Sequence, residues 1–452
     1  MVVQKFGGTS VADPDAIQRL IHIVGTARER DGRGPAVVVS AMSGVTDSLL
    51  AIASAAGAGR IDDALSRLEQ LRERHLSTAK SLAGKEARGA LGEQITSHFD
   101  DLMALVRALG VLREVSPRTL DVVAATGELL SSRIVVAALA EAGFPSEWVD
   151  ARRAIITSAD HTRAVPLASE TDAALRATVL AAVEAGKVPV LGGFVGSTVD
   201  GHTTTLGRGG SDYSGAIVGA GIGAREIQIW TDVDGMLTAD PRVIASPRLV
   251  PQLSFAEAAE LAYFGAKVLH PSTILPAVER NIPVRILNSR KPDGAGTMIT
   301  AEPSPNSMPL TALACKRDVT VVDITSSRML MAYGFLRRVF EVFERYTTAV
   351  DVVTTSEVTV SVTVDDRRHL EPIVEELSEF SQVQVDHEMA LLCAVGDRLR
   401  NEPAIAARAV GVLEEVPLRM ISQAASRRNI TVILRQADLQ HAMNRLHEEF
   451  FA

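Results

Sequence analysis

The sequence predicts an α/β protein with a mostly parallel central sheet, followed by two smaller α/β units. With 452 residues, the chain is too long for one compact core. Short β-branched runs alternate with longer helical patterns over the first 290 residues, as is typical of parallel sheets. Beyond the Pro- and Gly-rich stretch Arg290–Pro309 the pattern changes to shorter units, and this shorter pattern then repeats loosely.

The first region contains short β-branched strands separated by longer helices. The expected strands are Met1–Phe6, Ala36–Ser40, Val188–Gly192, Ile227–Thr231 and Val284–Leu287. The expected helices are Asp15–Arg28, Asp62–Leu82, Gln94–Gly110, Glu128–Ala142 and Thr171–Ala185. Ligands bind at the carboxyl ends of the strands in such sheets, so the loops that follow the strands are the first candidates for a site.

The second region contains two successive β-α-β-β units. The first has strands at Val319–Ile324, Val350–Thr354, Val358–Val364 and Gln382–Glu388, and helices at Gly334–Tyr346 and Leu370–Phe380. The second has strands at Met389–Val395, Arg419–Gln423 and Ile430–Arg435, and helices at Glu402–Glu415 and Asp438–Phe450. The expected domains are therefore 1–290, 311–385 and 386–452, with a linker at 291–310.

Composition excludes some classes of protein. A formal net charge of -9 argues against a nucleic-acid partner, because phosphate backbones are bound by basic faces. Cys315 and Cys393 lie in apolar stretches without metal-ligand spacing, as expected for buried thiols in a reducing compartment. The chain opens directly into VVQKFGG without a signal peptide, and apolar runs such as IVVAALAEAG are too short or too interrupted to span a membrane. We expect a cytoplasmic protein.

The motif KFGGTSV, Lys5–Val11, follows the first strand. The glycine pair, Gly7 and Gly8, lets the backbone approach a ligand and turn sharply. Backbone N–H groups and hydroxyls at this turn can then hold a phosphate, with Lys5 as a cation. The alternative is a plain strand–helix turn with a surface lysine.

The segment TTTLGRGGSDYSG, Thr203–Gly215, places Arg208, Ser211 and Asp212 among several glycines. This density of glycine and hydroxyl groups beside one arginine suits a phosphate-transfer loop. The alternative is a flexible hydrophilic loop. No Walker A motif occurs in the chain.

The segment WTDVDGMLTADPR follows the strand that ends at Thr231. Its aspartates lack the spacing and final glutamate of a calcium-binding EF-hand loop. We interpret it as a nucleotide-holding loop in which Arg242 reaches phosphate and Asp232 a ribose or adenine edge; the alternative is a surface hairpin. The glycines of GAGIGA, Gly219–Ala224, are expected only to end a helix, because no strand precedes them.

Three further residues have both a structural and a functional interpretation. Glu128 in ATGELLSS is expected to begin a helix, where a carboxylate is ordinary, or else to anchor a substrate ammonium. Thr46 in SAMSGVTD is part of an N-cap turn or a substrate contact. Lys267 in FGAKVLHP is a solvated lysine or a ligand for nucleotide, and His270 is expected to lie at a helix end.

The order of these motifs along the whole chain resembles that of the aspartate kinases in the amino-acid kinase family, closest to the lysine-sensitive single-chain class. The resemblance implies an amino-acid-kinase-like catalytic domain with a mostly parallel central sheet, followed by two βαββαβ ferredoxin-like ACT domains. It implies the reaction of ATP with L-aspartate to give ADP and 4-phospho-L-aspartate, the first step of the aspartate-family pathway. A kinase for another small acid and a non-catalytic amino-acid sensor are the alternatives.

The resemblance also implies roles for individual residues. Lys5 and Asp212 would be catalytic, Arg208 would hold the substrate α-carboxylate, and Glu128 its ammonium. The remaining substrate contacts would be Thr46, Gly209, Gly210 and Ser211. ATP, carrying Mg2+ on its phosphates, would be held by Lys5, Gly7, Gly8, Thr231, Asp232, Leu237, Arg242 and Lys267. The side-chain carboxylate of aspartate is ionised at neutral pH and needs no general base, so aligning the substrates and stabilising charge suffice.

An effector site and an assembly are implied as well. The effector residues would be Met329, Ala332, Gly334, Phe335, Leu336, Val350, Asp351, Ser356 and Glu357. Met331, Ala332 and Ala349 replace polar residues of the class, and Leu237 stands where the family often has a nucleotide-contacting tyrosine. We therefore expect inhibition by lysine that is weak or needs a second effector such as threonine. Pairing of ACT sheets implies a homodimer or a higher even oligomer.

Overall fold

The structure is a computed structural model that describes residues 1–207, 209–265, 269, 271–302, 309–326, 333–399, 401–423 and 426–451. The chain divides into two compact units. The first consists of Met1–Met236 and Val268–Glu302, and the second of Leu237–Lys267 and Pro303–Ala452. The segment 237–267 thus groups with the C-terminal part of the chain, although it lies inside the expected domain 1–290.

The first unit is built on a mostly parallel sheet. Its strands are β1 (Val2–Phe6), β2 (Ala36–Val39), β3 (Ser146–Trp148), β5 (Val188–Gly192), β8 (Glu226–Thr231), β10 (Val284–Asn288) and β11 (Thr297–Thr300). They lie in the order β3-β5-β2-β1-β8-β10-β11, and only β11 is antiparallel to its neighbour β10. The predicted parallel sheet is confirmed. Because β1, β2 and β8 run in parallel, their carboxyl ends meet at one edge of the sheet.

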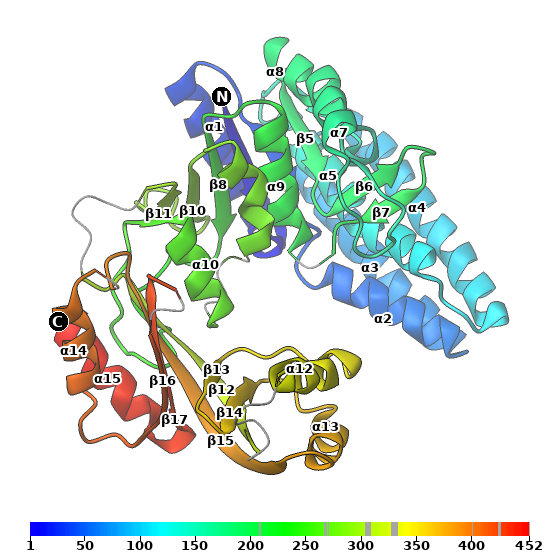
Figure 1. Cartoon of the computed structure of the whole chain (residues 1–452). Coiled ribbons are helices and arrows are strands. Elements are labelled where there is room, and N and C mark those ends of the chain that lie inside the picture. The colour runs from blue at the N-terminus through cyan, green and yellow to red at the C-terminus, as the bar shows by residue number, and fades with distance from the viewer. Residues whose placement is uncertain are drawn as a thin grey trace. The chain divides into compact units, whose positions relative to one another are not determined.

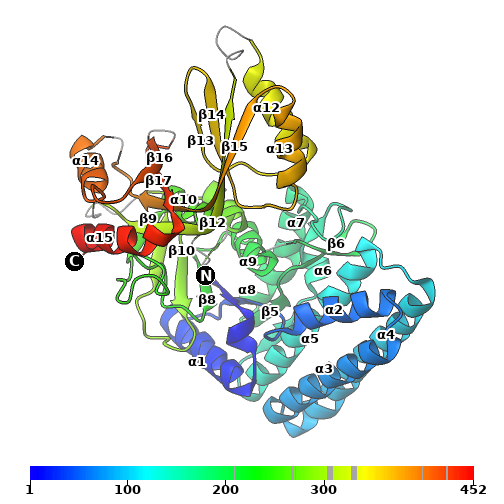
Figure 2. The ribbon, with the colours of Figure 1, turned by 90° about the horizontal axis from the view of Figure 1, so that it is seen from below.

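Helices and one small sheet complete this unit. The helices are α1 (Pro14–Asp31), α2 (Val45–Gly57), α3 (Ile61–Leu82), α4 (Lys85–Leu112), α5 (Pro117–Glu141), α6 (Ala151–Ala154), α7 (Ala168–Leu175), α8 (Ala181–Glu184), α9 (Gly210–Gly221) and α11 (Leu275–Glu279). Short helical turns lie at Gly8–Val11 and Pro271–Ile274, and a π-helical turn, Arg176–Leu180, joins α7 to α8. The small sheet has the order β4 (Ile156–Thr157), β6 (Val195–Thr198) and β7 (Thr203–Thr205). Helix α9 lies against β1 and β8 (Figure 1), and α3 and α4 run side by side (Figure 2).

Helix α5 differs from its prediction in two respects. It begins at Pro117, whose preceding residue Ser116 caps the helix, so Glu128 lies in its middle and the predicted start at Glu128 is wrong. Among the described helices, α5 is also the one long and apolar enough to cross a membrane by length and composition, whereas we expect every apolar run to be too short or too interrupted. Its apolar window is 78% buried inside the protein, as in the core helix of a globular domain.

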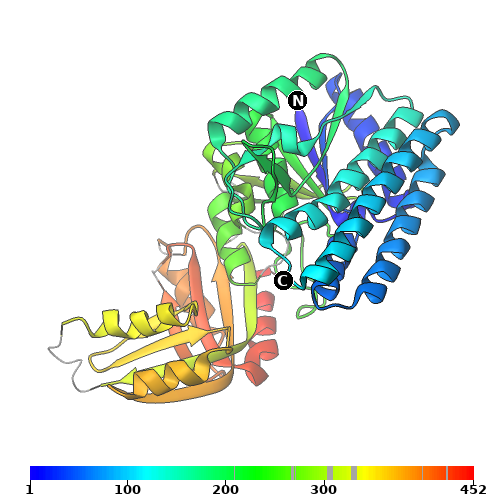
Figure 3. The ribbon, with the colours of Figure 1, turned by 90° about the vertical axis from the view of Figure 1, so that its right-hand side faces the viewer.

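The second unit is built on one antiparallel sheet, in the order β13 (Val353–Thr355), β14 (Thr359–Val364), β12 (Ala312–Thr325), β15 (Gln382–Val395), β17 (Asn429–Arg435) and β16 (Leu418–Gln423). Its other elements are β9 (Gln252–Ser254), α10 (Phe255–Tyr263), α12 (Phe335–Arg345), α13 (Leu370–Ser378), α14 (Pro403–Gly411), the turn Gln436–Asp438 and α15 (Leu439–Phe451). Helices α12 and α13 lie next to each other (Figure 3) and cover a core with β12 and β14, whereas α14 and α15 cover a second core.

The two central strands of this sheet are long and pass through both halves. Strands β12 and β15 have 14 residues each and pair with one another over most of their length. The predicted strands Gln382–Glu388 and Met389–Val395 are one strand, with Glu388 at a positive φ of 54° where the pairing shifts. The expected boundary between residues 385 and 386 therefore falls inside β15, and the expected linker 291–310 contains β11.

Candidate active site

An ion pair lies at the carboxyl end of β1. Lys5 is almost fully buried, and its Nζ is 2.6 Å from Oδ1 of Asp212, a residue in the first turn of α9. Gly215, one turn further along α9, lets the helix approach, because a Cβ there would lie 3.1 Å from Lys5 Cβ. The two residues predicted to be catalytic are thus brought together from motifs that lie far apart in the sequence.

The glycine turn that follows β1 is held by hydrogen bonds and by close contacts with neighbouring segments. The Gly7 N–H donates to the carbonyl oxygen of Trp230 at 2.9 Å, and Ser10 Oγ donates to Ser289 Oγ at 2.8 Å. A Cβ on Gly8 would lie 3.1 Å from the carbonyl oxygen of Ala41, so this position has little room for a side chain. The turn therefore keeps its backbone close to the ends of β2 and β8.

A cavity of about 390 Å³ opens at the same edge of the sheet. It brings together predicted residues from four separate motifs, together with hydroxyls and backbone of the segment after β2. Its lining residues are Gly7, Gly8, Thr9, Ser40, Ala41, Met42, Ser43, Gly44, Thr46, Asp47, Glu128, Thr231 and Asp232. The cavity joins phosphate-binding features to one carboxyl group within a single unit of the protein.

That carboxyl group, Glu128, is held in an unusual environment. Its side chain is 3% exposed, and its Oε2 has no hydrogen-bond partner. Burial raises the pKa of Glu128 to about 8, opposed by backbone hydrogen bonds from Ala41 and from Glu128 itself and by the charge of Lys5. A buried carboxyl oxygen without a partner, beside a cavity, suits a cationic group brought by a ligand.

Small residues and hydroxyls fix Glu128 in this position. Ser131, three residues along α5, donates to the carbonyl oxygen of Ser40 at 2.7 Å and so ties the helix to the end of β2. A Cβ on Gly192 would lie 2.9 Å from the carbonyl oxygen of Glu128, and one on Gly127 would lie 2.8 Å from Ala41 Cβ. Sequence reasoning missed Gly127, which directly precedes the predicted helix Glu128–Ala142, and Gly192, which ends the predicted strand Val188–Gly192.

The segment between β7 and α9 is shaped by close backbone contacts. Gly207 and Gly209 have positive φ values of 76° and 72°, which only glycine adopts without strain. A Cβ on Gly193 would lie 2.9 Å from Cα and Cβ of Ser211, so Gly193 sets how near this segment approaches β5. The Phe194 N–H also donates to Ser214 Oγ at 2.8 Å. Gly209, Gly210 and Ser211 thus sit at the N-terminus of α9, and Arg208 lies outside the described residues.

The predicted nucleotide residues fall into different parts of the chain. Thr231 and Asp232 line the cavity, whereas Leu237 and Arg242 belong to the second unit, where Arg242 Nη2 lies 2.5 Å from Asp240 Oδ2. Lys267 and His270 lie outside the described residues. No group of three or more His, Cys, Asp or Glu residues able to hold a metal occurs in the described part of the chain.

The predicted effector residues lie in the second unit. Gly334 precedes α12 with a φ of 85°, Phe335 and Leu336 open that helix, and Val350, Ser356 and Glu357 flank β13; Met329 and Ala332 lie outside the described residues. The buried carboxylate of Asp351 already has a cation, because Lys316 Nζ lies 3.0 and 3.1 Å from its two oxygens. Burial and the neighbouring Asp351 also raise the pKa of Tyr263 to about 12.

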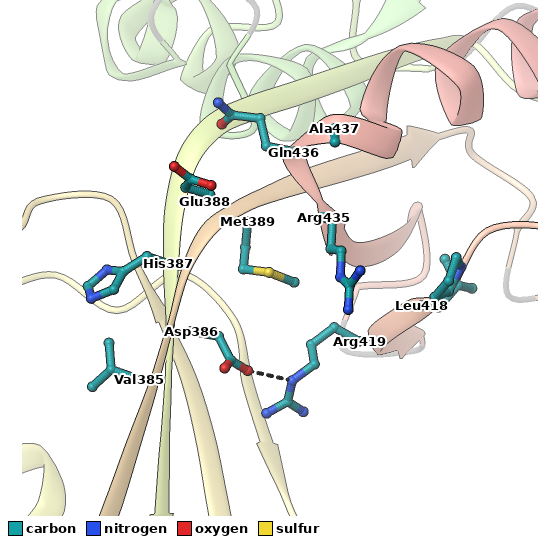
Figure 4. A pocket seen from close by; sticks show the side chains of 11 residues that line it. Val385, Asp386, His387, Glu388, Met389, Leu418, Arg419, Arg435, Gln436 and Ala437 are labelled. Atoms are coloured by element: carbon teal, nitrogen blue, oxygen red, sulfur yellow. Dashed lines mark hydrogen bonds and ion pairs between the residues drawn. The ribbon is translucent and has the colours of Figure 1, made fainter.

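A larger cavity of about 750 Å³ lies elsewhere in the second unit, along β15 and β16 (Figure 4). Its wall includes Arg419, whose Nε donates to Asp386 Oδ2 at 2.9 Å and whose guanidinium also pairs with Asp323. None of the predicted site residues lines it. The larger of these two cavities is therefore not the one that contains the predicted active-site residues.

Known proteins match the whole chain. Residues 1–288 match the amino acid kinase family, and residues 392–450 match an ACT domain. Aspartokinase 3, chloroplastic, of Arabidopsis thaliana is 37% identical over 99% of this chain and 81% of its own length. Lysine-sensitive aspartokinase 3 of Escherichia coli is 35% identical over 100% of this chain and 99% of its own length.

Solved structures agree with these relatives. E. coli aspartokinase III in complex with lysine and aspartate, in the T-state, has a TM-score of 0.84 at 34% identity, with both chains covered completely. The same enzyme in complex with aspartate and ADP, in the R-state, has a TM-score of 0.83. The chain therefore belongs to the amino acid kinase family and, within it, to the aspartokinases.

Proposed function

We propose that this protein transfers the γ-phosphoryl group of ATP to the side-chain carboxylate of L-aspartate, giving ADP and 4-phospho-L-aspartate. The observation that carries the proposal is the buried Glu128 carboxyl group, whose Oε2 lacks a partner beside a cavity lined by the glycine turn of β1. An α-ammonium group would supply the missing donor, and the turn would face phosphate. The E. coli relative solved with aspartate and ADP supports this choice of substrates.

For this reaction the protein needs only to align the two substrates and to stabilise the charge on the transferred phosphoryl group. The acceptor carboxylate is ionised at neutral pH, so no general base is required. Lys5, buried and paired with Asp212 at 2.6 Å, would neutralise charge that develops on the transferred phosphoryl group. Asp212 would orient the ammonium of Lys5, and the N-terminus of α9 would add N–H groups near the same point.

The nucleotide would be ATP with Mg2+. Thr231 and Asp232 at the end of β8 would contact it, with Gly7 and Gly8 beside its phosphates. The nucleotide contacts of Leu237, Arg242 and Lys267 stay predictions from the sequence. Mg2+ that is bound to nucleotide phosphates needs only one or two carboxylates and keeps several waters. The carboxylates available at the cavity, such as Asp232, suit this mode of binding. Mg2+ would neutralise the phosphates and help to align them.

Regulation by amino acids belongs to the same proposal. Lysine would bind the second unit at the residues around Gly334 and Asp351, as supported by the E. coli relative solved with lysine. Threonine is proposed as a second effector, and pairing of ACT sheets between chains would give a homodimer or a higher even oligomer. The catalytic domain would be 1–290, and the two ACT domains, 311–385 and 386–452, would share the long strand β15. A cytoplasmic location agrees with the two free cysteines, of which Cys393 is buried with a pKa raised to about 12.

An acyl-phosphate assay tests the reaction. The protein is incubated with ATP, Mg2+ and one acid at a time, namely aspartate, glutamate or succinate, and hydroxylamine traps any acyl phosphate. Product with aspartate alone supports the proposal, product mainly with another acid supports a different kinase, and no product with any acid supports an amino-acid sensor. Glu128→Gln should narrow the preference for aspartate over succinate, which lacks the ammonium group. Glu147→Gln, an exposed carboxylate paired with Lys187, is the matched control.

A further inference from the structure

Asp121 is a fully buried carboxylate that the reaction scheme above does not use. It lies one turn into α5, with an exposed fraction of 0%. Its oxygens accept hydrogen bonds from Thr205 Oγ1 at 2.6 Å and from the Thr162 N–H at 2.9 and 3.2 Å. Nδ1 of His161 lies 2.6 Å from its Oδ2. These partners offset the cost of burying the carboxylate, and they join three separate segments: α5, the residues 161–162 and β7.

Two of those segments hold the end of β7, just before the glycine turn that leads into α9. Thr205 is the last residue of β7, two residues before Gly207, and its carbonyl oxygen accepts from the Ala164 N–H at 2.9 Å. Gly207 packs on the loop that Asp121 organises, since a Cβ there would lie 3.2 Å from the carbonyl oxygen of Thr162. Thr162 itself has a positive φ of 69°, a conformation that its hydrogen bond to Asp121 helps to hold.

Asp121 and Glu128 also share one face of α5. They are seven positions apart, which corresponds to about two helical turns, so both side chains project from the same side of the helix. Glu128 lines the cavity. Asp121, two turns earlier in the helix, accepts a hydrogen bond from Thr205, which precedes the segment that leads to Asp212. The helix is a rigid spacer between the ammonium anchor and the loop that carries the other substrate contacts.

We propose that Asp121 is a positioning residue for the amino-acid substrate. By fixing Thr205 and Thr162, it sets where Gly209, Gly210 and Ser211 lie relative to Glu128 and Lys5. The inference rests on the proposed function, because it concerns how the same site receives aspartate. A misplacement of about 1 Å in such a site can reduce the rate about a hundredfold.

The test compares Asp121→Asn and Thr205→Val in the full-length protein, with Asp150→Asn as control. Thr205→Val keeps the shape of the side chain but removes the hydroxyl donor, and it stays informative if Asp121→Asn does not fold. Asp150 is a half-buried carboxylate at a helix N-terminus whose hydrogen bonds go to Arg152. For each variant, kcat, KM for aspartate and KM for ATP are measured with the hydroxylamine trap, and Tm is recorded.

We expect kcat/KM for aspartate to fall about ten- to a hundredfold in both test variants, while KM for ATP changes less than about twofold. The double variant should lose little more than either single one, because both changes act through one contact. A lower Tm with unchanged kinetic constants in the folded enzyme, or equal losses for aspartate and ATP, would overturn the inference. If the wild-type protein itself does not phosphorylate aspartate, the proposed function fails instead.

Discussion

The raised pKa of Glu128 predicts a specific pH dependence for the use of aspartate. An ammonium group binds well only to the ionised form of this carboxyl group. With a pKa of about 8, Glu128 is ionised in roughly one molecule in ten at pH 7 and in one in a hundred at pH 6. The apparent affinity for aspartate is reduced by the same fraction, so kcat/KM for aspartate should rise about tenfold from pH 6 to 7 and about fivefold from pH 7 to 8, and should level off above pH 8.

The assay measures initial rates at pH 6, 7, 8 and 9 with saturating ATP and varied aspartate. Glu128→Gln cannot ionise, so its kcat/KM for aspartate should be low and nearly independent of pH over this range. The kcat/KM for ATP at saturating aspartate is the internal control, because an ammonium already bound keeps Glu128 ionised. A wild-type profile for aspartate that is flat from pH 6 to 8, or a slope that persists in Glu128→Gln, would refute the reasoning.

The same group makes a prediction about stability. Its pKa is higher in the folded protein, about 8, than the ordinary value of 4.5. The free energy that it contributes to folding is therefore fully present below pH 4.5 and is lost as the pH rises through about 8. The free energy of unfolding, measured with denaturant, should be lower at pH 8.5 than at pH 5 in the wild type. In Glu128→Gln this difference between the two pH values should be smaller by up to a few kcal/mol. Equal losses in both proteins would contradict the raised pKa.

Three further perturbations test the rest of the site. Lys5→Ala should lower kcat about 10²–10³-fold with a smaller change in KM, measured by the trapping assay, because one charge-stabilising contact is lost. Gly193→Ala should lower kcat/KM for aspartate about ten- to a hundredfold, because the new Cβ would lie 2.9 Å from Ser211. Lys316→Met should make inhibition by lysine about tenfold more sensitive in an activity titration, because the Asp351 carboxylate then lacks its internal cation.

The first two of these changes have matched controls. Lys187→Ala removes an exposed lysine paired with Glu147, and it should leave turnover unchanged. Gly89→Ala fills open space on α4 and should stabilise the helix by about 0.5–1 kcal/mol without affecting kinetics. Near-normal turnover of Lys5→Ala, or unaltered use of aspartate by Gly193→Ala, would remove that residue from the scheme. A lysine titration of Lys316→Met that matches the wild type would show that Asp351 does not limit the effector.

Much of the fold could be predicted because, in the first unit, short β-branched runs differ clearly in sequence from the long helices between them. β-branched runs and long helices determine the sheet, and the glycine turn after β1 follows from its sequence alone. The sequence predicts a helix start at Glu128, because a carboxylate is ordinary in the first turn of an otherwise apolar helix. The structure instead places Glu128 in the middle of α5, where the preceding Gly127 packs against Ala41.

What could not be predicted depends on contacts between distant segments. Asp121 is one acidic residue in a mostly apolar stretch, and nothing local shows that Thr162 and Thr205 will satisfy it. Lys316 and Asp351 are both ordinary charged residues in sequence, and only the pairing of strands shows that one neutralises the other. Such residues acquire their roles from tertiary packing, which a single sequence does not contain.

The long central strands of the second unit carry a consequence for how it folds. Strands β12 and β15 each run through both halves of the six-stranded sheet, so the half with β13 and β14 and the half with β16 and β17 share these two strands. A chain cut between residues 385 and 386 would divide β15 and leave both fragments with unpaired backbone groups. The two ACT halves are therefore one cooperative unit, and amide hydrogens on either side of Glu388 should exchange with solvent through a single shared opening.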